Sequence, residues 1–142
     1  MGKAETKVTK KVREDLESIG ATVEKVSDRF RSCVSDLAVC LKGFYLKIEV
    51  KESEDAEYKT CQCLHLVEHH RGGGVGFFVH PENWEYLFGL IKEMPVTYDK
   101  LRRYGDVQVE CLIQKKLLKT IKNPLEKRTL LEGQQKQKRQ MK

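Results

Sequence analysis

The chain has 142 residues, a formal net charge of +6 and a sequence isoelectric point of about 9.0, and 39% of its residues are hydrophobic. This length and composition predict one globular domain with a sizeable core, and they exclude a wholly disordered chain. We expect no membrane span and no secretory signal, because no long apolar run is present, while the basic charge favours a polyanionic partner.

The spacing of apolar residues predicts helices and strands up to Pro95. Val8, Val12 and Leu16 recur at helical spacing, and Gly20 is suited to end that helix. The order of the predicted elements, αβββαβα, is typical of an α/β sandwich around a mixed sheet. These elements are a helix at 5–19, strands at 22–26, 36–41 and 44–51, a helix at 59–71, a strand at 75–79 and a helix at 82–94.

The pattern is weaker in the last third of the chain. The pattern predicts a short strand at 107–112 and a helix at 111–121, which Pro124 prevents from continuing. The final segment is rich in Lys, Arg and Gln, and we expect it to be frayed or disordered. The chain therefore divides into a core at 1–95, an accessory extension at 96–125 and a basic tail at 126–142.

One carboxylate lies on the apolar face of the first predicted helix. Glu5 precedes Val8 by three residues and Val12 by seven, so it shares their face. Glu14 and Glu17 are placed on the solvent side instead. Because a carboxylate at the end of a buried stripe is unusual, the spacing selects Glu5 as a candidate site acid.

A predicted hairpin brings three further ionisable side chains together. Alternation along its second strand places Glu49 and Lys51 on one face, opposite the apolar residues between them. Asp36 opens the preceding strand and can approach both across the ladder. Two carboxylates and an amine at one strand end are typical of metal-dependent phosphodiester chemistry.

These residues resemble the signature of the PD-(D/E)XK nuclease superfamily. The central match is Asp36 followed by Glu49-Val50-Lys51. The helix around Glu5 resembles the first helix of small phage-type VRR-NUC nucleases and Holliday-junction resolvases, and Gln62 with the Gly pair at 73–74 resembles the helix after their catalytic strand. The resemblance implies an α/β, αβββαβα restriction-endonuclease-like sandwich with a central mixed sheet, extended here at the C-terminus.

The resemblance also implies a Mg²⁺ or Mn²⁺ site and a role for each residue. Lys51 would orient or deprotonate the attacking water, or stabilise the charge that develops on the phosphate. Gln62 would hold water or phosphate nearby. The expected metal ligands are Asp36, Glu49, the backbone carbonyl of Val50 and, directly or through water, Glu5.

The expected function is therefore a Mg²⁺-dependent endonuclease that hydrolyses DNA and selects branched or Holliday-junction-like structures. A homodimer is implied, because two symmetric cuts need two sites. We expect the protein in the cytosol of a prokaryotic or virus-infected cell. The candidate DNA-binding residues are Arg29, Arg31, Lys136, Lys138 and Arg139, although the tail is equally consistent with a solubilising role.

Two other functions stay open at this point. One is a DNA-binding module of the same fold that does not cleave, and the other is a zinc-bound interaction domain. Cys61, His65 and His69 are successive i, i+4 steps of a helix, so the outer pair lies about 12 Å apart and cannot share an ion. The soft candidate ligands are Cys61, Cys63, His65, His69 and His70.

The glycine run at 72–74 and the cysteines have simple structural interpretations. Gly72-Gly73-Gly74 follows a helix and precedes a strand, which is the reverse of a phosphate-binding loop, so it is expected to end the helix. The five cysteines form no CxxC pair and have irregular spacing, so they are expected to be reduced thiols.

Overall fold

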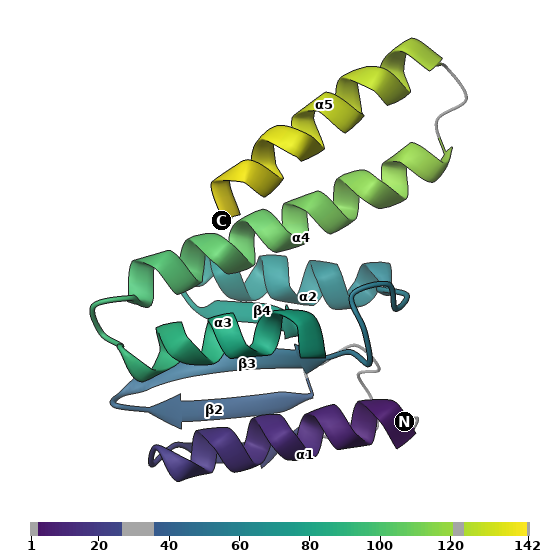
Figure 1. The fold of residues 1–142 in the computed structure, drawn as a ribbon. Helices are drawn as coiled ribbons and strands as arrows, with labels where there is room; N and C mark the ends of the chain where they lie inside the picture. The colour runs from purple at the N-terminus through teal and green to yellow at the C-terminus, as the bar shows by residue number, and fades with distance from the viewer. Residues whose placement is uncertain (1–2, 27–35, 121–123, 142) are drawn as a thin grey trace.

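A computed structural model describes residues 3–26, 36–120 and 124–141 of the chain (Figure 1). Four strands and five helices are formed in these ranges. They are α1 (Lys3–Ser18), β1 (Thr22–Lys25), β2 (Leu37–Leu41), β3 (Phe44–Val50), α2 (Thr60–Arg71), β4 (Val75–Val79), α3 (Pro81–Lys92), α4 (Tyr98–Thr120) and α5 (Pro124–Met141).

The four strands form one mixed sheet in the order β1-β2-β3-β4. The β1–β2 and β2–β3 pairs are antiparallel, and the β3–β4 pair is parallel. Lys42 and Gly43 join β2 to β3, and both have positive φ, which suits a two-residue hairpin turn. The predicted α/β sandwich around a mixed sheet is thereby confirmed.

Helices cover both faces of the sheet, and a separate hydrophobic core lies on each face. On one face, Ile48 of β3 is buried in the same cluster as Leu16 of α1 and Leu87 of α3. On the other face, Phe78 of β4 packs in a cluster with Val109 of α4, and α2 contributes to this second layer. The alternation along β3 decides which side chains enter the first core and which face α2.

The C-terminal third differs from its expectation in two ways. The predicted strand at 107–112 is wrong, because these residues lie within the 23-residue helix α4. The tail, for which we expected no regular structure, forms α5, which folds back along α4 (Figure 1). Polar side chains make this contact, since Gln134 is buried and donates to the Cys111 carbonyl at 3.4 Å.

Two remaining expectations concern the membrane and the cysteines. Among the described residues, no helix combines the length and apolarity that crossing a bilayer requires. Cys40, Cys63 and Cys111 are free thiols, but Cys61 is disulfide-bonded, so the expectation of reduced thiols throughout is wrong for Cys61. Gly72 follows the last residue of α2, as expected for a helix stop.

The contact between α4 and the sheet predicts a sharp difference between two glycines. A Cβ added at Gly105 of α4 would meet the backbone carbonyl oxygen of Gly76 in β4, whereas a Cβ at Gly89 of α3 would meet nothing within 4 Å. We expect Gly105→Ala to lower the free energy of unfolding by about 3 kcal/mol. Gly89→Ala should leave it unchanged or raise it by up to about 1 kcal/mol. Urea denaturation measures both, and equal effects would contradict this packing.

Candidate active site at the end of strand β3

The candidate site lies where β3 ends, between the start of β2 and the start of α2. Asp36 immediately precedes β2, and its Oδ2 accepts a hydrogen bond from the Val50 backbone N–H at 2.9 Å. The N–H of the next residue, Lys51, points the other way and donates to the Val79 carbonyl at 2.7 Å. Because N–H and C=O of one strand residue point to the same side, the Val50 carbonyl lies on the Asp36 side.

Asp36 and Glu49 form a close pair of carboxyl groups. The register pairs Leu37 with Ile48, which puts Asp36 opposite Glu49 one position further along the ladder. Glu49 is only 4% exposed. Its burial, the neighbouring Asp36 charge and a hydrogen bond to the Asp36 side chain raise the pKa of Glu49 to about 9. A buried carboxyl group next to a second one therefore holds a proton unless a cation replaces it.

Gln62 bridges the acid pair to the lysine. Its Oε1 accepts a hydrogen bond from Lys51 Nζ at 2.8 Å, and its Nε2 donates to Glu49 Oε1 at 2.8 Å. Lys51 can only donate, so the amide orientation is fixed by chemistry and the NH₂ group must face Glu49. Because Gln62 stands in the first turn of α2, the helix start holds this bridge against the end of β3.

Glu5 approaches the same site from α1. The pKa of Glu5 is raised, first by burial and then by the charge of Asp36, while the Lys51 charge opposes the rise. These influences place Glu5 within electrostatic reach of the site residues. Glu14, in contrast, is 65% exposed at its side chain and lies 3.9 Å from Lys10 on the solvent side of the helix.

Two residues that the sequence reasoning did not assign also border the site. Lys51 Nζ lies 5.5 Å from the centre of the Tyr58 ring, and Tyr58 is buried. Lys47 Nζ lies 3.3 Å from His65 Nε2, which is one helical turn beyond Gln62. A signal for Lys47 was present in the sequence, because alternation puts it on the same face as Glu49 and Lys51.

Two of the candidate zinc ligands, His69 and His70, make other contacts. His69 Nε2 lies 3.0 Å from the Val75 carbonyl oxygen. His70 Nε2 lies 2.8 Å from the Gly76 carbonyl oxygen, and its Nδ1 lies 2.9 Å from Asp106. In the described part of the chain, no three His, Cys, Asp or Glu side chains are grouped to hold a metal ion.

The candidate DNA-binding residues are not gathered at this site. Arg29 and Arg31 lie outside the described residues. Lys136, Lys138 and Arg139 are exposed on α5, which packs on α4. These three basic residues therefore lie on a different layer of the molecule from the carboxylates at the end of β3.

The donors at the end of β3 are all oxygen atoms. Two carboxyl groups lie side by side at Asp36 and Glu49, and the Val50 carbonyl lies on the same side. Such hard donors are the ones that Mg²⁺ and Mn²⁺ prefer, whereas zinc prefers nitrogen and sulfur. The residues therefore fit a hard divalent cation, and the ammonium group of Lys51 lies beside them.

The buried Glu49 predicts that the metal-free protein loses stability as the pH rises. The pKa of Glu49 is about 9 in the folded protein against its ordinary value of 4.5. The contribution of Glu49 to the free energy of unfolding is fully present below about pH 4.5 and is lost as the pH rises through about 9. We expect unfolding in urea and EDTA to show this fall, by up to about 1.4 kcal/mol per pH unit. Glu49→Gln should flatten it, and parallel pH profiles for the two proteins would contradict the burial argument.

Comparison with known proteins tests the resemblance. No protein-family model matches the chain, and no curated protein matches it. A solved structure described as a VRR_NUC domain is similar, with a TM-score of 0.58 and 28% sequence identity. The match covers 66% of this chain and 99% of that one. This chain therefore has the VRR-NUC, PD-(D/E)XK nuclease-like fold, as the sequence resemblance implied.

Proposed function

We propose that this protein is a metal-dependent endonuclease that hydrolyses DNA phosphodiester bonds. The observation that carries the proposal is the continuous set of contacts from Asp36 through Glu49 and Gln62 to Lys51. A buried carboxyl group that contacts a half-buried one and is joined to a lysine has no evident role in stability, because burying ionisable groups is costly. Its chemistry suits an anionic substrate and a divalent cation.

The proposed ligands of Mg²⁺ or Mn²⁺ are Asp36, Glu49 and the Val50 carbonyl, with Glu5 contributing directly or through water. Bound there, the metal would polarise the scissile phosphate and lower the pKa of a coordinated water. Asp36 is held in place by the Val50 N–H at 2.9 Å, and Glu49 is held by Gln62 at 2.8 Å. The ligands are thus oriented before the substrate arrives, which lowers the cost of reorganisation.

Lys51 supplies the positive charge of the site. Its side chain is only 9% exposed and is held by the Gln62 amide oxygen and the face of the Tyr58 ring. An ammonium group fixed in this way can orient or deprotonate the attacking water, or stabilise the charge that develops on the phosphate. Gln62 acts as a positioning residue, because it holds both Lys51 and Glu49.

Branched DNA is the proposed substrate, and a homodimer is the proposed assembly. Both rest on the resemblance to Holliday-junction resolvases, in which two sites make two symmetric cuts. The setting proposed with them is the cytosol of a prokaryotic or virus-infected cell. Sequence-independent phosphate contacts are assigned to Arg29, Arg31, Lys136, Lys138 and Arg139, in keeping with the net charge of +6.

A DNA-binding module without cleavage is the second candidate function. It shares the fold and the basic charge with the nuclease, so binding alone does not separate them. The acid pair favours hydrolysis, because carboxylates at a binding surface would repel phosphate unless a cation lay between them.

Cleavage is tested with duplex, flap, single-stranded and four-way DNA. We expect cutting with Mg²⁺ or Mn²⁺, poor cutting with Ca²⁺ and none in excess EDTA. Asp36→Ala, Glu49→Ala and Lys51→Ala should each lower the rate by roughly a hundredfold or more. Double variants should lose little beyond the single ones, because the residues act as one unit.

Circular dichroism of the same variants provides the control for folding. Undiminished cutting in EDTA would contradict the metal mechanism. A fully active Asp36→Ala protein would show that the site is elsewhere.

Glu5 and Glu14 form a matched pair on α1. We expect Glu5→Gln to lower the cleavage rate at least tenfold more than Glu14→Gln, because the Glu5 carboxyl group lies within electrostatic reach of Asp36 and Lys51. Steady-state cleavage rates at saturating Mg²⁺ measure the difference. Equal rates for the two variants would remove Glu5 from the site.

A further inference from the structure

The face of β3 that carries Glu49 and Lys51 meets α2 along its whole length. Moving back along the strand from the acid pair, Lys47 Nζ contacts His65 at 3.3 Å, and the Tyr45 ring contacts the His69 ring edge-on at 5.9 Å between centroids. We call these four residues the β3–α2 row. Successive members on β3 lie about 6.6 Å apart, which is comparable with the spacing of phosphates along an extended single strand.

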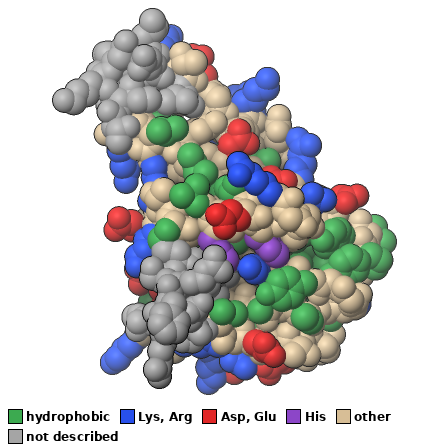
Figure 2. All heavy atoms as spheres, turned by 180° about the vertical axis from the view of Figure 1, so that it is seen from behind, with side chains coloured by type: hydrophobic (Ala, Val, Ile, Leu, Met, Phe, Trp, Pro, Cys, Tyr) green, Lys and Arg blue, Asp and Glu red, His purple; other side chains and the backbone are tan. Residues whose placement is uncertain are grey.

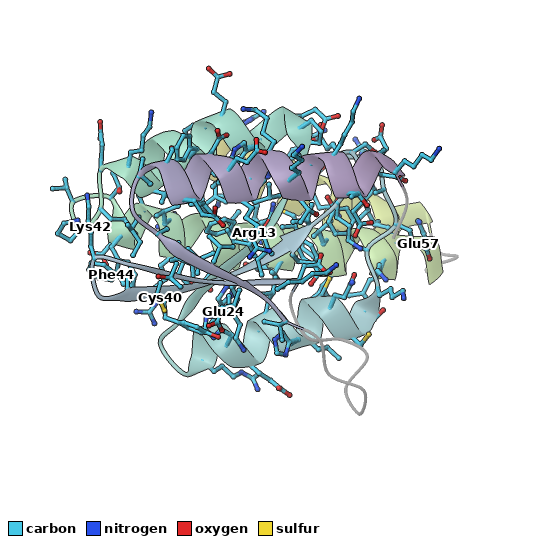
Figure 3. All side chains as sticks on the ribbon, turned by 90° about the horizontal axis from the view of Figure 1, so that it is seen from below. Arg13, Glu24, Cys40, Lys42, Phe44 and Glu57 are labelled. Carbon is cyan, nitrogen blue, oxygen red and sulfur yellow. The ribbon has the colours of Figure 1, made fainter. Side chains whose placement is uncertain are left out.

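The row is accessible from the neighbouring half of the sheet. The register places Ala38 beside Lys47, and Cys40 beside Tyr45, so small side chains continue this face onto β2. Cys40 is exposed and Tyr45 is 45% exposed. Figure 3 shows Cys40 and Glu24 on the side of the sheet away from α1.

Lys47 is the cationic member of the row, and burial keeps His69 less charged than an ordinary histidine. The pKa of His69 is lowered, mainly by burial and then by the neighbouring Lys47, His70 and His65. Figure 2 shows histidine side chains near the middle of this face, next to Lys or Arg and hydrophobic side chains. A phosphate bound at this place would be held by the charge of Lys47, with the His65 ring beside it at 3.3 Å.

A hollow continues the row beyond Tyr45. It has a volume of about 490 Å³, and its lining includes Tyr45, His69, Tyr98 and the glycines at 72–74. Glu68 also borders it. The exposed ring of Tyr45 borders this hollow, and a ring with an exposed surface is what stacks on the bases of single strands.

We infer that the β3–α2 row binds one unpaired DNA strand beside the cleavage site, with Lys47 and His65 on a backbone phosphate and Tyr45 stacked on a base. The inference deepens the proposed function and rests on it, because the acid pair next to Lys47 is where the strand would be cut. Bases within a duplex are already stacked on one another, so a base that stacks on Tyr45 must be unpaired.

The test measures binding separately from cleavage. Fluorescence anisotropy of a labelled single-stranded oligonucleotide, and of the blunt duplex with the same sequence, is recorded with Ca²⁺ in place of Mg²⁺. Tyr45→Ala should weaken single-strand binding roughly five- to hundredfold and affect the duplex little. Lys47→Gln should make the slope of log K against log salt shallower by about 0.7, and Lys47→Arg should restore it.

Matched control variants come from other surfaces of the chain. Tyr86 of α3 is exposed to a similar degree, at 42%, and Lys10 is an exposed lysine on the solvent side of α1. Tyr86→Ala and Lys10→Gln should bind as the wild type does, and thermal unfolding checks that every variant is folded.

Three outcomes would overturn the inference. They are Tyr45→Ala and Lys47→Gln proteins that bind like the controls, equal losses for single strand and duplex, or a wild type that binds no DNA. Binding that depends on the row, in a protein that cleaves nothing with Mg²⁺, would instead refute the nuclease proposal and leave the row in place.

Discussion

The contact between the half-buried Asp36 carboxyl group and the buried Glu49 carboxyl group is the constraint on which the site depends. Two acids at this separation cannot both be ionised in a buried place without a compensating positive charge, which is why the pKa of Glu49 rises to about 9. The protein supplies part of the compensation through the Gln62 amide and, beyond it, Lys51. A divalent cation held by these carboxyl groups, as we propose, would supply the rest, so the same pair that costs stability in the metal-free fold would favour metal binding.

The fold produces this contact through elements that are close together in the sequence. A two-residue turn at Lys42 and Gly43 sets the β2–β3 register, and that register brings Asp36 opposite Glu49. The chain then returns through α2, whose first turn presents Gln62 to the end of β3. Because α2 runs back along β3, its later turns reach Lys47 and Tyr45, and the site continues into a row that a strand can follow.

Sequence reasoning placed Glu49 and Lys51 on one face from strand alternation, which is a local property, and identified Gln62 through the resemblance to the nuclease superfamily. It misread residues 107–112 as a strand, because Val107 and Val109 alternate with polar residues. Both valines are instead buried side chains of the long helix α4. It did not foresee the helix in the tail, whose contacts with α4 are made by polar side chains. The Lys47–His65 contact joins a strand to a helix, and its existence depends on how α2 packs on the sheet, which periodicity does not encode.

Calorimetric titration of the metal-free protein with Mg²⁺ or Mn²⁺ near neutral pH, in the absence of DNA, measures directly whether the acid pair holds a cation. We expect saturable binding by the wild type and loss of that binding in both Asp36→Asn and Glu49→Gln, with the fold retained. Glu14→Gln, which changes an exposed acid on the solvent side of α1, should bind as the wild type does. Binding that survives in Glu49→Gln, or a wild type that binds no divalent cation, would contradict the account.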